Sequence, residues 1–183
     1  MKTILCALLA IACVPWIHAT SMFIAGLDEL STESEMIVQA KVTSTVTQWT
    51  KDNTQIVTYI RANIVDDLIS DKEDNEIILA QPGGKVGVVT MEIEGTTTYK
   101  VGDDNILFLR KDPSMPGTWQ TIGLYQGKYK IYKDASGVQR VAQEIDGKVV
   151  LYKRTADTTP VETGNNLPLD QFKVKVLEYR ASR

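Results

Sequence analysis

The stretch MIVQAKVTSTV, residues 36–46, decides the fold. Its apolar residues at even positions alternate with mostly polar ones, and a period of two is typical of a half-buried β-strand. The same alternation returns between Ile56 and Ile64, after the turn Lys51–Asn53. Two alternating segments joined by a short turn predict a long β-hairpin with one apolar face. On this pattern we expect Val46 to share the apolar face with Val42.

Shorter strands are predicted after the hairpin. The run Ile106–Leu109 is apolar on both faces, which indicates a central strand that is covered on both sides. The last four predicted strands are separated only by short glycine turns, so they are expected to form a β-meander. The predicted strands are Ile77–Leu79, Val89–Ile93, Ile106–Leu109, Trp119–Ile122, Lys128–Tyr132, Val138–Ala142 and Lys148–Tyr152.

Helices are predicted near both ends of the chain. A short one covers Gly26–Ser31, and the spacing of Phe172, Val176 and Tyr179 places them on one face of a C-terminal helix that packs on the sheet. Residues 154–166 are rich in Thr, Asp, Asn and Gly, which favours a linker or long loop. We therefore expect a signal peptide (1–19), a β-barrel domain with a meander extension (20–153), and a linker with a C-terminal helix (154–183). The predicted class is all-β, mainly antiparallel.

The first 19 residues have the three-part layout of a secretory leader. Lys2 supplies a positive charge, the run Ile4–Val14 is apolar, and Ile17-His18-Ala19 has the spacing that a signal peptidase reads. We predict cleavage after Ala19, a secreted or periplasmic location, and no stable membrane insertion after cleavage. Two alternatives stay open. The leader can remain as an uncleaved N-terminal anchor, or a lipid can be attached at Cys13.

The composition excludes several kinds of chemistry. Both cysteines, Cys6 and Cys13, and the single histidine, His18, lie in the leader. The rest of the chain therefore cannot form a disulfide, a Ser-His-Asp or Cys-His catalytic group, or a zinc site of His and Cys ligands. We expect a protein that is not an enzyme and has no cofactor, metal or catalytic residue. Its net charge of −3, without a basic run, argues against nucleic acid as a partner.

Three turn motifs carry a resemblance to known proteins. They are Gln81-Pro82-Gly83-Gly84-x-x-Gly87, Tyr99-x-x-Gly102-Asp103 and Gly123-x-x-Gln126-Gly127-Lys128-Tyr129. Over residues 30–133 the chain resembles an uncharacterised family of secreted bacterial β-rich proteins. More distantly, its order of elements is similar to the netrin-like OB barrel of tissue inhibitors of metalloproteinases. The resemblance implies an OB-like barrel. Those inhibitors chelate the protease zinc through an N-terminal cysteine, which this chain lacks after Ala19.

A group of lysines and aromatic residues is the best candidate for a binding surface. Lys128, Lys130 and Tyr132 fall on one face of a predicted strand, and Tyr129 falls on the other, apolar face. Together with Trp119, the first three can present a surface to a sugar, a peptide or a protein. The competing interpretation is ordinary packing of an amphipathic strand.

Acidic and glycine-rich turns offer weaker candidates. The pairs Asp66-Asp67 and Asp103-Asp104 can serve acid/base chemistry, but Asp is also common in turns for local hydrogen bonding. The segment 71–76 has oxygen ligands for calcium but lacks the EF-hand spacing. The segment 81–84 lacks the Lys-Ser/Thr of a phosphate-binding loop, so a structural bulge is favoured there.

These observations lead to one preferred function and two alternatives. The preferred one is an exported, non-enzymatic β-barrel module that binds or inhibits another secreted protein, such as a protease. The first alternative is a carboxylate-based extracellular hydrolase acting on glycans, which needs two carboxyl groups roughly 5–10 Å apart across a cleft. The second is nucleic-acid binding, as in many OB folds, and the acidic charge disfavours it.

Overall fold

The computed structural model describes residues 20–70, 75–144, 149–154 and 160–182. The leader and the candidate calcium ligands 71–74 lie outside these residues. The helices are α2 (Leu27–Glu33), α3 (Leu169–Ala181) and the 3₁₀ turn η1 (Leu124–Gly127). The strands are β1 (Thr20–Phe23), β2 (Met36–Trp49), β3 (Ile56–Ile69), β4 (Glu76–Pro82), β5 (Gly84–Val86), β6 (Val89–Met91), β7 (Asp104–Lys111), β8 (Trp119–Thr121), β9 (Lys128–Lys133), β10 (Gln139–Gln143) and β11 (Val149–Tyr152).

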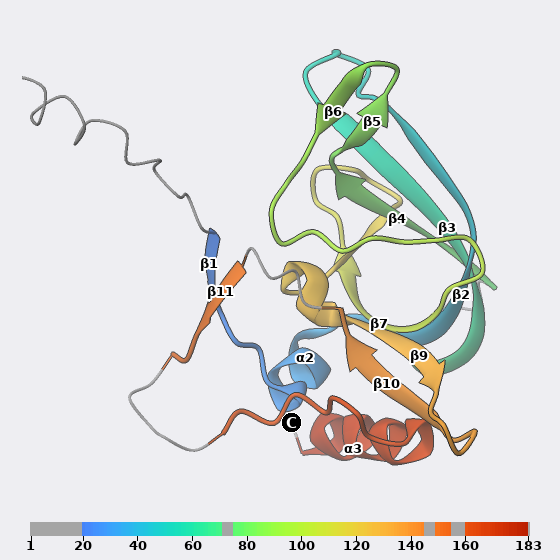
Figure 1. The fold of residues 1–183 in the computed structure, drawn as a ribbon, viewed down its shortest axis with the longest axis vertical. Helices are drawn as coiled ribbons and strands as arrows, with labels where there is room; N and C mark the ends of the chain where they lie inside the picture. The colour runs from blue at the N-terminus through green and yellow to red at the C-terminus, as the bar shows by residue number, and fades with distance from the viewer. Residues whose placement is uncertain (1–19, 71–74, 145–148, 155–159, 183) are drawn as a thin grey trace, which may run out of the picture.

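Five strands close into a barrel (Figure 1). The predicted hairpin is confirmed, because β2 and β3 pair antiparallel along most of their length. Around the ring β3 pairs with β4, β2 pairs with β7, and β7 pairs with β8, all of them antiparallel. The first two ladders are long, and the β7–β8 ladder is short. The short β8 also meets β4 in parallel, at Leu79 and Trp119. The expectation of a mainly antiparallel all-β barrel is therefore confirmed.

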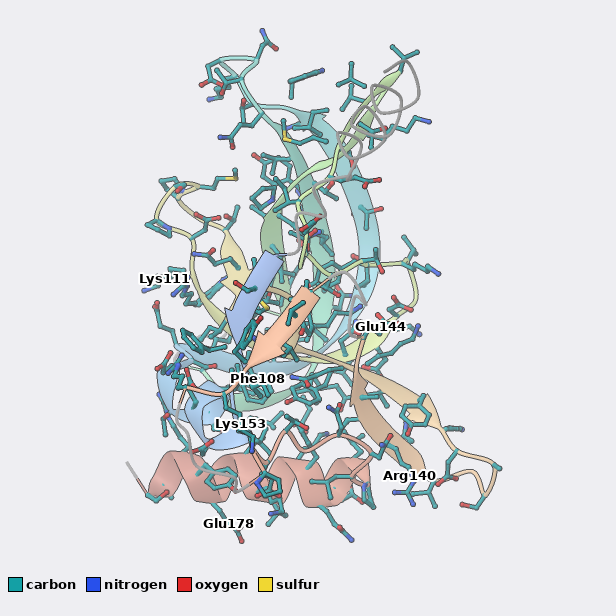
Figure 2. The ribbon with its side chains drawn as sticks, turned by 60° about the vertical axis from the view of Figure 1, so that its left-hand side comes forward. Phe108, Lys111, Arg140, Glu144, Lys153 and Glu178 are labelled. Atoms are coloured by element: carbon teal, nitrogen blue, oxygen red, sulfur yellow. The ribbon has the colours of Figure 1, made fainter. Side chains whose placement is uncertain are left out.

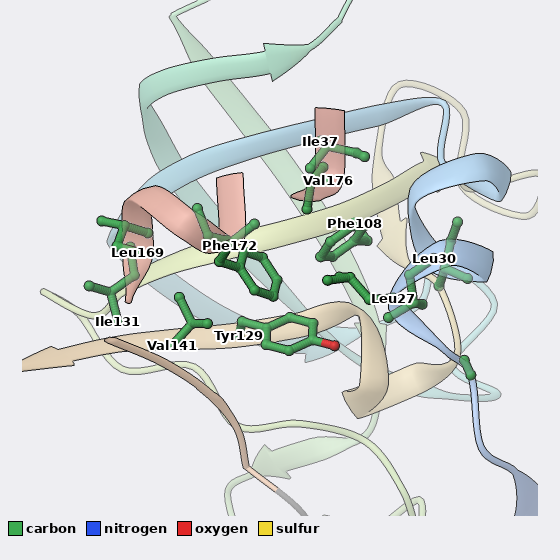
Figure 3. Close-up of a cluster of buried hydrophobic side chains, with 13 residues drawn as sticks. Leu27, Leu30, Ile37, Phe108, Tyr129, Ile131, Val141, Leu169, Phe172 and Val176 are labelled. Atoms are coloured by element: carbon green, nitrogen blue, oxygen red, sulfur yellow. The ribbon is translucent and has the colours of Figure 1, made fainter. Parts of the chain in front are cut away.

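Two apolar clusters lie on either side of β7. Ile106 and Phe108 face a cluster outside the barrel that α2 and α3 cover, whereas Leu107 and Leu109 face the barrel interior. Figure 3 shows the outer cluster, in which the ring of Tyr129 lies 4.7 Å from that of Phe172 between centroids. All four residues of the run are fully buried. The prediction of a strand covered on both sides is confirmed.

The predicted meander differs from the structure at both of its ends. Only β9 and β10 form a hairpin, which extends the sheet from β7. The strand at Trp119 instead closes the barrel, and η1, entered through Gly123 at φ +62°, separates it from β9. The strand at Val149 leaves the sheet and pairs in parallel with β1, a strand that the sequence pattern did not predict.

The C-terminal helix is confirmed and covers one end of the barrel. Phe172 and Val176 of α3 are fully buried in the outer cluster. Polar contacts add to this packing, since the Lys173 ammonium donates to Gln39 at 2.7 Å and to Asp66 at 2.8 Å. Figures 1 and 2 place α3 at one end of the molecule, while Figure 1 places the β5–β6 hairpin at the other. No helix among the described residues is long and apolar enough to cross a membrane.

Candidate binding groove at the barrel mouth

The inner face of the β2–β3 hairpin changes its chemistry toward the open end of the barrel. Val42 and Ala62 still belong to the barrel core. Beyond them Thr45 lies opposite Ile60, and Thr47 lies opposite Thr58, and residues that lie opposite in a ladder share a face. The aliphatic interior of the barrel therefore continues into a mouth that is lined by hydroxyl groups.

A β-bulge brings these threonines to the inner face. The register of β2 against β3 shifts between Val42 and Ser44, which inserts one extra residue. Beyond this bulge each side chain of β2 points to the face opposite to the one that uninterrupted alternation would give it. Val46 therefore lies on the outer face, 54% exposed, where it lines a separate shallow groove of about 300 Å³ with Tyr59 and Arg61. The expectation that Val46 lies with Val42 is wrong, because strict alternation carries no sign of a bulge.

The turn at Gln81–Gly84 covers one side of the mouth. The Thr58 hydroxyl donates to the Gly83 carbonyl at 2.8 Å and lies 2.9 Å from the Thr47 hydroxyl. Gly83 and Gly84 have φ of +98° and +128°, a backbone conformation that residues with a side chain rarely adopt. A Cβ on Gly84 would lie 2.5 Å from the Thr58 hydroxyl oxygen. At this motif the base of the β5–β6 hairpin therefore packs closely against the barrel.

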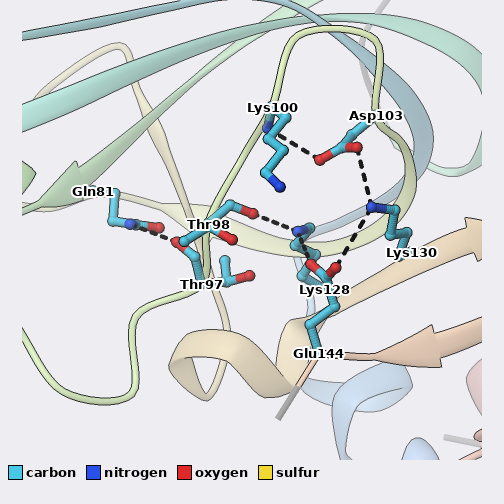
Figure 4. A network of polar contacts seen from close by, with 8 residues as sticks. All are labelled: Gln81, Thr97, Thr98, Lys100, Asp103, Lys128, Lys130 and Glu144. Carbon is cyan, nitrogen blue, oxygen red and sulfur yellow. Dashed lines mark hydrogen bonds and ion pairs between the residues drawn. The ribbon is translucent and has the colours of Figure 1, made fainter. Parts of the chain in front are cut away.

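The segment 96–99 forms a second wall and is held by contacts from Gln81 and Lys128 (Figure 4). The Gln81 side-chain amide donates to the Thr97 carbonyl at 2.7 Å, and the Lys128 ammonium donates to the Thr98 carbonyl at 2.5 Å. Lys128 also lies 4.9 Å from the centre of the Tyr99 ring. These contacts hold an extended segment in place although no strand pairs with it among the described residues.

A chain of alternating charges supports this wall from behind. Glu144 accepts a hydrogen bond from Lys128 at 2.7 Å and lies 3.5 Å from Lys130, which in turn lies 3.3 Å from Asp103. Burial tends to raise the pKa of Glu144, but the two ammonium groups outweigh it and the pKa is lowered. Burial tends to lower the pKa of Lys130, but Asp103 and Glu144 outweigh it and the pKa is raised. Glu144 and Lys130 therefore both stay ionised at neutral pH.

Together these walls enclose an open groove of about 500 Å³, within the size range of sites for small ligands and peptide segments. Hydroxyl groups and apolar side chains dominate its lining. The charged residues that line it, Lys85, Glu92 and Glu94, are exposed. The other lining residues are Thr45, Thr47, Thr58, Ile60, Gln81, Pro82, Gly83, Gly84, Thr90, Met91, Ile93, Thr96, Thr97, Thr98 and Tyr99.

The structure does not bring the four predicted binding residues onto one surface. Trp119 is buried in the barrel core. Lys128 is only 1% exposed, and its ammonium forms an ion pair with Glu144 inside the molecule. Lys130 is half-buried between carboxylates, and the Tyr132 hydroxyl donates to Asn166 at 3.0 Å. The predicted alternation itself is confirmed, since Tyr129 faces the outer cluster. Sequence reasoning missed the groove because it depends on the unpredicted bulge.

The candidate carboxylates are divided between different contacts. Asp103 faces Lys130, whereas Asp104 accepts hydrogen bonds from Gln39 at 3.0 and 3.1 Å. Gln39 and Lys173 connect Asp104 to Asp66 through one polar network, while Asp67 accepts a hydrogen bond from Ser70. None of these carboxylates lines the groove at the mouth. The arrangement supports the hydrolase alternative less than a binding function.

In comparisons with protein-family models, curated proteins and solved structures, none matches this chain.

Proposed function

We propose that this protein is an exported, non-enzymatic β-barrel module that binds another protein through the end that carries the β5–β6 hairpin. One observation carries the proposal. The hairpin tip, residues 86–89, consists of three valines and a glycine, and Val88 is 99% exposed while Val89 is 43% exposed. Contiguous apolar side chains on the surface mark interaction sites.

The tip stands on a fixed base. The Gly83 N–H donates to the Ile56 carbonyl at 2.8 Å, and the Thr58 hydroxyl donates to the Gly83 carbonyl. These contacts anchor the start of the β5–β6 hairpin to the barrel. Burial of apolar surface against a partner stabilises a complex by roughly 25 cal/mol per Å². An anchored hairpin base also reduces the conformational freedom that is lost on binding, which favours association.

We also propose that the barrel is OB-like and, more distantly, netrin-like. The ring order β2-β3-β4-β8-β7 supports this assignment, because an OB fold is a five-stranded Greek-key barrel. A shared fold does not give a shared function. The zinc-chelating cysteine of the tissue inhibitors has no counterpart after Ala19. An inhibitor-like role would therefore act by contact of the hairpin end.

Export is part of the proposal and rests on the layout of residues 1–19. Expression of the full chain in a secreting host, followed by mass spectrometry of the product, tests it. We expect a protein that begins at Thr20. A product that keeps the leader, or that carries lipid on Cys13, would contradict cleavage after Ala19.

A capture experiment tests the binding function. The wild-type protein is immobilised and mixed with the extracellular or periplasmic fraction of the source cells. We expect a protein that binds the wild type and is lost when Val88 and Val89 are both changed to serine. The matched control changes Val65 and Val101, two exposed valines outside the tip, to serine. Equal capture by both double variants, with unchanged thermal unfolding, would contradict the proposal.

A further inference from the structure

The groove at the barrel mouth has the chemistry of a site for an uncharged, extended ligand. Its floor is formed by Thr45, Thr47, Thr58 and Ile60, which carry hydroxyl and methyl groups but no charge. Threonine favours the strand conformation and adds a donor and an acceptor to its apolar methyl group. A charged group that entered this floor would leave water without an opposite charge beside it.

Several polar groups in the lining lack partners among the described residues. Thr97 is only 5% exposed, and its side-chain hydroxyl is fully buried. This hydroxyl neither donates nor accepts a hydrogen bond among the described residues. The hydroxyls of Thr45 and Thr90 and the backbone N–H of the exposed Thr98 likewise make no hydrogen bond within the described part of the chain. Thr45, Thr90 and Thr98 are exposed, so their polar groups are accessible to the carbonyl and amide groups of a ligand.

The lining favours a peptide over a sugar. Sugar rings pack their C–H faces on exposed aromatic rings, and the one aromatic residue in the lining is Tyr99. Its hydroxyl is fully buried, and the Lys128 ammonium lies over its ring. The apolar part of the lining is aliphatic instead, with Ile60, Met91 and Ile93. Aliphatic side chains beside free polar groups suit the alternating side chains and backbone of an extended peptide.

We propose that this groove binds an extended, uncharged segment of the partner protein, with small, hydroxyl-bearing or aliphatic side chains. This inference rests on the proposed function, since the groove lies directly beside the valine tip, and β6 connects the two. The tip then contacts the surface of the partner while the groove receives one of its strands or loops. The wall at 96–99, held by Gln81 and Lys128, keeps the groove open for the segment.

Adjacent positions of β2 provide a matched pair of variants. Thr45 lines the groove, whereas Val46 lies on the opposite face of the same strand. Thr45→Trp fills the groove and Val46→Trp adds the same bulk outside it. Both substitutions keep a side chain that is favoured in strands. Circular dichroism and thermal unfolding verify that both variants fold.

The probe is a random heptapeptide display library selected on the immobilised full chain. Synthetic copies of enriched peptides are then titrated against wild type and both variants. We expect uncharged sequences whose affinity falls at least about 10-fold in Thr45→Trp and less than about twofold in Val46→Trp. Added peptide should also shift the methyl NMR signals of Ile60, Met91 and Ile93.

Other outcomes would overturn the inference. One is a library that yields no peptide. Another is a set of peptides that bind Thr45→Trp as well as wild type, or that lose affinity only in Val46→Trp. A third is a glycan that binds the wild type on an array, is blocked by Thr45→Trp, and has no peptide counterpart. The valine-tip experiment separates the two proposals. Capture that depends on Val88 and Val89 but not on Thr45 would leave the proposed function standing and remove the peptide groove.

Discussion

At the scale of single residues, Gly84 makes the closest approach between the hairpin base and the barrel. Its φ of +128° is a region that other residues rarely adopt, and a Cβ there would meet Thr58 and Thr47 at 2.5 and 2.6 Å. We expect Gly84→Ala to lower the free energy of unfolding by about 2 kcal/mol or more. Urea denaturation measures this.

Gly87 provides the control for this prediction. It also has a positive φ, of +61°, but nothing lies within 4 Å of its Cβ position. Gly87→Ala therefore tests the backbone strain without the close approach, and we expect a loss of only about 1 kcal/mol. If both variants lost the same free energy of unfolding, the close contact of Gly84 with β2 and β3 would not explain the need for glycine at this position.

Lys128 is the residue whose role differs most from the sequence-based expectation. Its ammonium holds the Thr98 carbonyl and the Glu144 carboxylate inside the molecule. We expect Lys128→Met to destabilise the fold by about 1–3 kcal/mol, since both acceptors lose a charged donor. Lys133→Met, at the exposed end of the same strand, is the matched control and should change stability little. Urea denaturation of both variants gives the comparison, and equal stability would contradict the role of Lys128.

Glu144 predicts a dependence of stability on pH. Its pKa in the folded protein is lowered from the ordinary value of 4.5. A carboxylate with a lowered pKa stabilises the fold above the unfolded-state pKa, and this contribution is lost as the pH falls through the folded-state pKa. We expect Glu144→Gln to be less stable than wild type at pH 7 and to lose less stability on acidification below about pH 4.5. Parallel pH profiles of the two proteins would contradict this.

At the scale of elements, the regular strands were predictable and the irregular pairings were not. Period-two alternation located β2 and β3, and the continuous apolar run Ile106–Leu109 located β7, which is buried on both faces. The bulge after Val42 escaped prediction, since an extra residue in one strand is visible only against its partner. The positions of β8 and β11 also depend on distant strands, β4 and β1, and short-range turn signals favoured a meander instead.

The C-terminal helix is predicted to be an integral part of the fold. Phe172 is fully buried and packs against Phe108 and Tyr129, so we expect Phe172→Ala to lower the free energy of unfolding by about 3–5 kcal/mol. Val174 on the same helix is exposed, and Val174→Ala should cost less than about 0.5 kcal/mol. Chemical denaturation of both variants gives the comparison. A small effect of Phe172→Ala would mean that α3 is a loosely attached appendage.

At the scale of the whole molecule, the two ends of the barrel differ. Helices α2 and α3 cover one end and bury the outer cluster. The other end carries the valine tip and the hydroxyl-lined groove. The candidate site could not be read from motifs, because it is built from common threonines and valines whose closeness depends on the bulge and on the contacts of Gly83 and Gly84. This asymmetry leads us to place the partner at the hairpin end.

Hydrogen–deuterium exchange of the chain, alone and bound to its captured partner, tests this placement most directly. We predict that binding slows exchange in the hairpin and the wall, residues 84–99, and at the mouth ends of β2 and β3, around Thr47 and Thr58. Exchange in α3 and in the β9–β10 hairpin should stay unchanged. Protection confined to α3, β9 or β10, with residues 84–99 unaffected, would contradict the account.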